Sequence, residues 1–287
     1  QISCIASPWD GFEDGPVGEG WVQVHQDAKS WVSAGRDHTC TNNFDLSYDC
    51  WGDNSFGQSN QGPSVNYYQL EVGGDFTCGI TQNNGGLDCW GDQAANQHLT
   101  PLGSFVDMGL GTTHGCAIAS TGEAVVWGSA LAWTDPVPST SLLTAVSAGQ
   151  DYCCALETSG ALDCWGFGKP VDSAAGSYRA VAAGDAHVCV LDQSGNISCY
   201  GDDTYNQVSG APLGEFDSIS AGWRHSCAVQ TGTNFVTCWG DNAHGQLTAP
   251  TGQFHQVDAG WYHSCAKRPN DTVECWGCID HDSGQCG

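Results

Sequence analysis

The sequence predicts an all-β fold in which seven similar blades form a ring, a β-propeller. The first observation is a repeat, because one cysteine recurs at steps of 38, 38, 38, 35, 38 and 38 residues along the chain. The second is that each copy reads as short alternating strands rather than a helix, as in Ser226 to Gln230 followed by Phe235 to Trp239. The third is that these strands carry apolar residues on both faces, and a ring of blades covers both faces of every blade.

Each copy is expected to contain three short strands. The first, such as Val257 to Ala259, ends at a glycine where the backbone needs either a positive φ or close approach to another chain segment. A β-hairpin follows. Most copies then continue from Trp-Gly into a polar loop that ends in Gln, as in Asp53 to Gln58 and Asp241 to Gln246.

The seven copies fill residues 32–287 as a single domain, and residues 1–31 precede them as an N-terminal tail. The net charge is −25, with 7 Lys plus Arg against 32 Asp plus Glu, which disfavours binding to nucleic acid or anionic lipid. The longest apolar stretch, Ala124 to Trp133, is too short and too interrupted for membrane insertion. A chain that begins at Gln1 is typical of a processed, mature form.

Six cysteine pairs with hairpin spacing predict one disulfide in six of the seven blades. The pairs are Cys40–Cys50, Cys78–Cys89, Cys154–Cys164, Cys189–Cys199, Cys227–Cys238 and Cys265–Cys275. Evenly spread pairs do not build a tetrahedral zinc site, so disulfides are favoured over metal. Regular disulfides indicate a secreted, extracellular or cell-surface protein. The sequons at Asn196 and Asn270 are compatible with glycosylation on that route.

The remaining cysteines predict further bonds. Val126 replaces the second hairpin cysteine of the third copy, and the fourth copy has an extra Cys153, so a Cys116–Cys153 bridge between blades is expected. Cys4, Cys278 and Cys286 lie near the termini. Two of these three are expected to bond, either clasping the N-terminal segment to the last blade or joining Cys278 to Cys286. The third would be free or intermolecular.

The V-x-A-G-x-x-H-x-C, C-W-G and G-Q spacings resemble the regulator-of-chromosome-condensation repeat, whose family folds as a seven-bladed β-propeller. The disulfide-rich version resembles the secreted or receptor-ectodomain branch of that family. The likeness extends from about residue 32 to the end of the chain. It implies a ring closed by an N-terminal strand that completes the last blade, and the segment Trp21 to Val24 has strand character. Lys29 departs from the aromatic or Leu that precedes the other copies.

Two sets of repeated polar residues have a structural and a metal-binding interpretation. His38, His114, His187, His225 and His263 share one repeat position, whereas Phe76 and Tyr152 take it in the other two copies. Because Phe can replace it, the histidine is expected to satisfy backbone groups rather than to bind metal or sense pH. Asp53, Asp92, Asp202 and Asp241 follow Trp-Gly, and turn capping explains them more simply than calcium binding. No cofactor or metal is expected, with calcium left as the alternative.

Known catalytic motifs are absent, so the protein is not expected to be an enzyme. The strongest binding candidates are the two variable residues between the repeat glycine and the histidine position. In copies one, six and seven they bring together Arg36, Trp223, Arg224, Trp261 and Tyr262. Trp, Tyr and Arg dominate binding hot spots, so this corner is expected to bind a partner protein or a carbohydrate. The alternative is that the aromatic rings only plug the mouth of the ring.

The sequence therefore predicts a non-enzymatic extracellular propeller with a structural or interaction role. One form is a self-associating subunit of a surface assembly or filament, because Ile2, Ile5, Trp9 and Phe12 give the N-terminal tail apolar residues that need a packing site. The alternative is a secreted protein-binding inhibitor, or a receptor or adhesion ectodomain, that binds through one face of the propeller.

Overall fold

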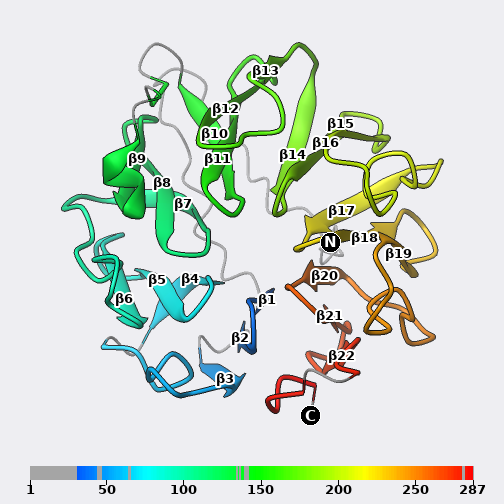
Figure 1. Ribbon diagram of the computed structural model, residues 1–287, viewed down its shortest axis with the longest axis horizontal. Coiled ribbons are helices and arrows are strands. Elements are labelled where there is room, and N and C mark those ends of the chain that lie inside the picture. The colour runs from blue at the N-terminus through cyan, green and yellow to red at the C-terminus, as the bar shows by residue number, and fades with distance from the viewer. Residues whose placement is uncertain are drawn as a thin grey trace, which may run out of the picture.

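The computed structural model describes residues 31–43, 47–63, 66–133, 135, 137–138, 142–279 and 282–286. Within these residues the chain forms seven antiparallel sheets arranged as a ring (Figure 1). The predicted seven-bladed, all-β architecture is thereby confirmed. The proposed closing strand at Trp21 to Val24, Lys29 and Cys4 lie outside the described residues. No helix in the described part of the chain has the length and apolar character needed to span a bilayer.

Each blade uses the same strand order, and its first strand lines the centre of the ring. The first four blades are β1 (Trp31–Ala34), β2 (His38–Asn42) and β3 (Tyr48–Gly52); β4 (Tyr67–Val72), β5 (Phe76–Thr81) and β6 (Leu87–Gly91); β7 (Phe105–Leu110), β8 (His114–Ala119) and β9 (Ala124–Gly128); and β10 (Leu143–Ala148), β11 (Tyr152–Glu157), β12 (Leu162–Gly166) and the short β13 (Ser173–Ala174). The last three are β14 (Tyr178–Ala183), β15 (His187–Asp192) and β16 (Ile197–Gly201); β17 (Phe216–Ala221), β18 (His225–Gln230) and β19 (Val236–Gly240); and β20 (Gln256–Ala259), β21 (Ser264–Lys267) and β22 (Val273–Trp276). A 3-10 turn, Ser129–Ala132, follows β9.

Hairpin register explains the disulfides. In blade 6, Cys227 lies directly opposite Cys238, and their Cα atoms are 4.0 Å apart. The other five predicted pairs are bonded in the same way, so the prediction of one hairpin disulfide in six blades is confirmed. Each bond restricts the unfolded chain and contributes roughly 2–3 kcal/mol. In blade 3, Val126 takes the place opposite Cys116.

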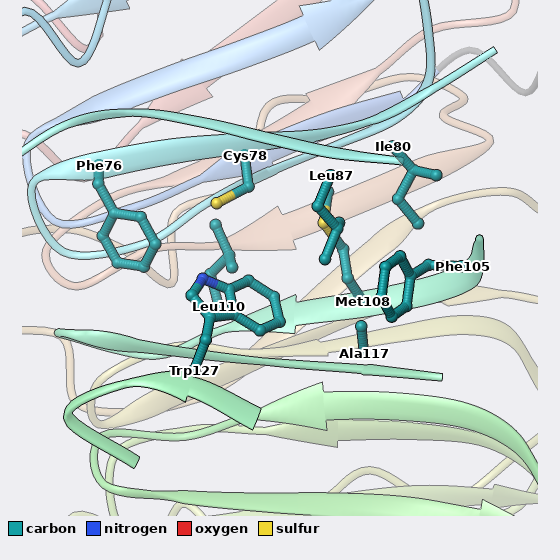
Figure 2. Close-up of a cluster of buried hydrophobic side chains, with 9 residues drawn as sticks. All are labelled: Phe76, Cys78, Ile80, Leu87, Phe105, Met108, Leu110, Ala117 and Trp127. Atoms are coloured by element: carbon teal, nitrogen blue, oxygen red, sulfur yellow. The ribbon is translucent and has the colours of Figure 1, made fainter. Parts of the chain in front are cut away.

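The apolar core lies between neighbouring blades. Figure 2 shows one such interface, in which Phe76 and Ile80 of blade 2 face Phe105 and Met108 of blade 3. All four side chains are buried. Each side chain of this size contributes roughly 1.5–3 kcal/mol relative to its exposed state. The predicted sandwiching of every blade between two others is the source of this burial.

Polar contacts close the ring near its axis. Ser220 Oγ of blade 6 accepts a hydrogen bond from the backbone N–H of Ala259 in blade 7, at 3.0 Å. At the equivalent position Asp258 Oδ2 accepts from the backbone N–H of Ala34, at 2.6 Å, so blade 7 contacts blade 1 as it contacts blade 6. The repeat glycine permits the close approach: a Cβ on Gly35 would lie 2.4 Å from the carbonyl oxygen of Gly73. Close approach, not positive φ, is therefore what this glycine provides.

The C-terminal segment adds a contact that the sequence analysis missed. The carbonyl oxygen of Gln285 accepts a hydrogen bond from the Trp51 indole N–H, at 3.0 Å. In blades 2, 6 and 7 the corresponding tryptophan donates to the Gln carbonyl of the preceding loop, in the pairs Trp90–Gln58, Trp239–Gln207 and Trp276–Gln246. The segment that contains Gln285 thus gives blade 1 the contact that blades 2, 6 and 7 receive from the preceding loop, and the C-terminus lies next to the first blade in the ring (Figure 1).

Candidate interaction site on the upper face

The antiparallel strand order gives the ring two distinct faces. The corners between first and second strands, such as Trp223–Arg224, all lie on one face, which we call the upper face. The hairpin turns between second and third strands lie on the opposite, lower face. Asn196 and Asn270 are in such turns, on β15–β16 and β21–β22, and both are exposed.

Three aromatic side chains meet at the corners of blades 6 and 7. The rings of Trp223 and Trp261 stack with centroids 5.7 Å apart and an interplanar angle of 22°. Tyr262 contacts Trp223 edge-on, with centroids 5.2 Å apart. These corners are neighbours because consecutive blades are adjacent in the ring. All three side chains are partly exposed.

Two arginines extend this stack. The Arg224 guanidinium lies 3.8 Å from the centre of the Trp223 ring, and its Nη1 donates to the Tyr205 hydroxyl at 2.8 Å. Arg36 of blade 1 lies 5.6 Å from the centre of the Trp261 ring. The structure therefore brings together all the binding residues named from the sequence. We call Arg36, Trp223, Arg224, Trp261 and Tyr262 the aromatic patch.

Asp75 and Tyr205 also belong to this region, although the sequence analysis did not name them as binding residues. Arg36 donates from Nε to Asp37 at 3.0 Å and from Nη2 to Asp75. Burial raises the pKa of Asp75, and the adjacent Arg36 opposes that rise. Tyr205 belongs to the polar loop after blade 5. That loop lies on the same face as the corner of blade 6, which follows it in the chain. This proximity in the sequence could have indicated that Tyr205 contacts the patch.

A small cavity lies on the axis beside the patch. It has a volume of about 70 Å³, and its lining includes Gln150, Asp185, Trp223 and Trp261 together with the repeat glycines. We call it the axial cup. The two indoles line this cup but do not fill it, so the interpretation of the aromatic rings as a plug holds only in part.

Asp185 has an unusual environment in the axial cup. Its Oδ1 atom is buried and has no hydrogen-bond partner. Burial raises the pKa of the carboxyl, and the nearby Arg224 guanidinium partly opposes that rise. A hydrogen bond from the Trp223 side chain also opposes that rise in the pKa.

The repeated histidines have a structural role, but their partners differ from those expected. His187 Nε2 hydrogen-bonds with the Ser226 hydroxyl of the next blade at 2.8 Å, rather than with a backbone group. Equivalent hydrogen bonds between neighbouring blades join His38 to Thr77, His225 to Ser264 and His263 to Thr39. Burial lowers the pKa of His187 to about 4, which keeps the imidazole neutral.

His114 is the exception, because Cys153 occupies the hydroxyl position of the next blade. Cys153 is bonded to Cys116, with Cα atoms 6.5 Å apart, which is the pairing between blades expected from the sequence. These three side chains form the one group of potential metal ligands found in the described part of the chain. Both sulfur atoms are committed to the disulfide, so the group does not offer free thiolates.

The aspartates after Trp-Gly cap turns, as the simpler interpretation predicted. Asp53 accepts from the backbone N–H of Ser55 and from Gln58 Nε2, the latter at 2.7 Å. Asp202 makes the corresponding bond to Gln207 Nε2, also at 2.7 Å. These bonds hold the Gln loop in the conformation that presents its carbonyl to the next tryptophan.

Comparison with known proteins identifies the repeat. The family model described as "Regulator of chromosome condensation (RCC1) repeat" matches residues 178–207 and 216–246, which cover blades 5 and 6 with their following loops. Blades 5 and 6 therefore match the RCC1 repeat model. The resemblance stated from the V-x-A-G-x-x-H-x-C and C-W-G spacings is therefore confirmed.

Solved structures share the propeller fold of this chain. The CRINKLY ectodomain of the receptor kinase ACR4 from Arabidopsis thaliana has 22% identity and a TM-score of 0.76, with 87% of this chain and 94% of that one covered. The ectodomain of the receptor kinase CR4 from Physcomitrella patens has 22% identity and a TM-score of 0.75, covering 86% and 72%. Yeast RCC1 (Prp20) bound to Kap60 has 18% identity and a TM-score of 0.64, covering 80% and 77%. At these identities the likeness establishes the fold.

Proposed function

We propose that this RCC1-repeat propeller is a non-enzymatic extracellular interaction module that binds a protein partner through the aromatic patch. The observation that carries the proposal is the patch itself, in which Trp223, Trp261 and Tyr262 are fixed in contact with one another and with two arginines. Rigid, partly exposed Trp, Tyr and Arg side chains are the usual centre of a protein–protein interface. Binding would order few further side chains, which lowers its entropic cost.

Two features support an extracellular location. Every cysteine from Cys40 to Cys286 is in one of eight disulfides, a density typical of secreted proteins and ectodomains. The sequons at Asn196 and Asn270 are exposed on the lower face. Glycans there would leave the aromatic patch on the upper face uncovered. A secreted inhibitor and a receptor or adhesion ectodomain are both forms of this function.

A protein partner fits the patch better than a carbohydrate. Sugars bind aromatic residues by lying flat against an open ring face. Here Trp223 has Arg224 over its ring and is stacked on Trp261, which in turn has Arg36 over its ring. The indole faces are thus engaged within the patch, and the ring edges and guanidinium groups remain for a partner to contact.

The test is a comparison of two variants in capture of binding partners from the extracellular fluid of the native source. Trp223→Ala with Trp261→Ala should lose the partner, because truncation of an interface hot spot costs roughly 2 kcal/mol or more per residue. Phe235→Ala is the control, since Phe235 is a half-exposed aromatic residue in a lower-face turn. If the wild type, the double variant and Phe235→Ala all retained the partner equally, the assignment of the patch as the binding site would be refuted.

A second candidate, self-association, is favoured by the cysteine pairing. Cys278 is bonded to Cys286, which is the second of the two clasps considered for the terminal cysteines. Cys4 is then the one cysteine left for an intermolecular bond, as in a subunit of a surface assembly or filament. A disulfide-linked dimer on a non-reducing gel that disappears with Cys4→Ser would support this candidate. A full-length protein that is strictly monomeric at high concentration would contradict it.

A further inference from the structure

We propose that the Cys116–Cys153 bridge is a site of reversible reduction by dithiols, and that His114 stabilises its reduced form. The bridge joins blades 3 and 4, whereas the aromatic patch belongs to blades 6, 7 and 1. Three features lead to this inference: the position of Cys153, the buried ring of His114, and the loop that follows blade 3.

Cys153 occupies a position that carries a hydroxyl group in four other blades. In blade 6 this residue is Ser226, whose Oγ lies 2.8 Å from His187 Nε2 and 3.9 Å from Cys189 Sγ of the preceding blade. The same pair of contacts recurs at Thr39, Thr77 and Ser264. A side chain at this position therefore lies beside both the histidine and the first hairpin cysteine of the preceding blade. In blade 4 that side chain is a cysteine, and it is bonded to Cys116.

The bridge leaves His114 without the hydroxyl group that its equivalents contact. Neither ring nitrogen of His114 makes a hydrogen bond of good geometry to any described residue. The side chain is 0% exposed, so bulk water does not replace the missing partner. The backbone of Tyr152 gives a weaker contact, which opposes the lowering of the His114 pKa to about 4 by burial. A buried polar atom without a good partner is costly, and this cost destabilises the disulfide form.

Reduction supplies the missing partner. A thiol group on Cys153 has one S–H donor, and an imidazole that contacts the Tyr152 backbone through one nitrogen presents the other as an acceptor. Elsewhere in the ring the hydroxyl proton is used differently, since Thr77 donates to the carbonyl of Gln58 in the preceding loop. The loop from Ser129 to Leu142, after blade 3, contains no Gln. No Gln carbonyl of that loop therefore competes with His114 for the thiol proton.

The exchange is balanced between the protein and the dithiol. A thiolate of the dithiol attacks one sulfur atom of the bridge, which breaks the S–S bond and forms a mixed disulfide. The second thiol group of the dithiol then displaces the protein sulfur, and the dithiol leaves as a cyclic disulfide. It has lost two electrons and two protons, which Cys116 and Cys153 have gained as thiol groups. Both cysteines are buried, so the exchange proceeds through a local opening between the blades, whereas the equilibrium depends only on the two end states.

The direct test equilibrates the full chain under nitrogen with buffers of graded ratios of reduced to oxidised dithiothreitol. Acid quenching, alkylation in denaturant and peptide mapping then give the reduced fraction of each bridge. Cys116–Cys153 should be half reduced at a lower ratio than the six hairpin bridges. His114→Leu should raise that ratio by about fivefold or more, because the reduced form loses its acceptor.

The control is His187→Leu, which removes the equivalent histidine of blade 5, where the partner is Ser226. It should leave the reduction of Cys116–Cys153 unchanged. A bridge that is no easier to reduce than the hairpin bridges, or an equal effect of the two histidine variants, would overturn the proposal.

A second pair of variants tests the hydrogen bond without any reductant. Cys116→Ala with Cys153→Ser places a hydroxyl group beside His114, as at the other interfaces, whereas Cys116→Ala with Cys153→Ala does not. The first variant should have a thermal midpoint about 2–4 °C above that of the second. Equal midpoints would show that His114 gains nothing from a donor at this position, and the proposal would then be wrong.

Discussion

Lys267→Met should lower the free energy of unfolding by about 2–3 kcal/mol, because this lysine joins the last blade to the first from a fully buried position. Its side chain is 0% exposed. Its Nζ donates to Thr41 Oγ1 at 3.0 Å and to the carbonyl oxygen of Asn42 at 2.7 Å. It also pairs with Asp271 at 3.4 Å. The seam between blades 7 and 1 thus depends on a buried charge.

The magnitude follows from opposing effects. Hydrogen bonds from a charged donor contribute roughly 1.5–3 kcal/mol each, and their loss would leave the Asn42 carbonyl without this donor. Removal of the ammonium also relieves the cost of its burial, which can be several kcal/mol. Asp271 is 27% exposed, so water can still solvate the carboxylate that would be left behind. The net loss should therefore be about half of the gross hydrogen-bond energy.

The repeat register makes this test informative. Lys267 lies opposite Val273 in its hairpin, as Val229 lies opposite Val236 in blade 6. Blades 2 to 6 have an apolar side chain at the position of Lys267, and blade 1 has Asn42. Methionine would give blade 7 the apolar side chain that these five blades have.

Thermal unfolding under non-reducing conditions measures the effect. A loss of 2–3 kcal/mol should lower the midpoint by about 4–10 °C in a domain of this size. Lys169→Met is the matched control, since Lys169 pairs with Asp135 and Asp172 in a loop near the surface. Lys169→Met should lower the free energy of unfolding by no more than about 1 kcal/mol. If Lys267→Met were as stable as the wild type, the seam would pack equally well without the charge, and the reasoning would be refuted.

Three further substitutions test other contacts of the ring. Burial, reinforced by Asp258, raises the pKa of Glu71 from 4.5 to about 8. The free energy of unfolding should therefore be highest below pH 4.5, where Glu71 is protonated in both states, and should fall as the pH rises to about 8. Glu71→Gln should flatten this decline in urea titrations at a series of pH values. An unchanged pH profile would contradict this prediction. Trp51→Phe should cost about 1–2 kcal/mol by removing the indole donor from the Gln285 carbonyl, and limited proteolysis should then cleave the C-terminal segment faster; equal cleavage would count against the role of this segment in closing the ring. Ser226→Ala should cost about 1–3 kcal/mol by removing the partner of His187, with guanidinium unfolding as the measurement and no change as the contrary result.

The sequence was sufficient to predict the architecture because the repeat encodes it locally. A cysteine at position 227 faces one at position 238 only if the chain between them forms a hairpin, and six copies have such a pair at a separation of 10 or 11 residues. The clustering of Trp223 with Trp261 also followed from sequence, since consecutive repeats must place equivalent corners side by side.

Contacts between blades were harder to predict because their two partners lie in different repeats. The histidine hydrogen bonds do have a signal in the repeats. In the next copy, the residue just after the histidine position is Ser or Thr wherever such a bond forms. His187 meets a blade that has Ser226, whereas Phe76 meets a blade that has Gly115. The contact of Gln285 does have a sequence signal, because Gly284-Gln285 repeats the Gly-Gln of other loops, such as Gly57-Gln58 and Gly245-Gln246. The unpartnered oxygen of Asp185 has no sequence signal at all.

The geometry of the corner explains why this face can acquire binding residues without loss of the fold. At the corner of blade 6, the backbone N–H of Gly222 donates to the carbonyl of His225 at 2.8 Å, and that of Trp223 donates to Gly260 at 3.2 Å. The carbonyl of Arg224 accepts from the N–H of Asp241 at 2.9 Å. Both variable residues are thus held through their backbones, which any amino acid other than proline provides. Their side chains can therefore vary without loss of these hydrogen bonds. Each corner can carry side chains suited to a partner, because the disulfides and the buried interfaces between blades stabilise the ring.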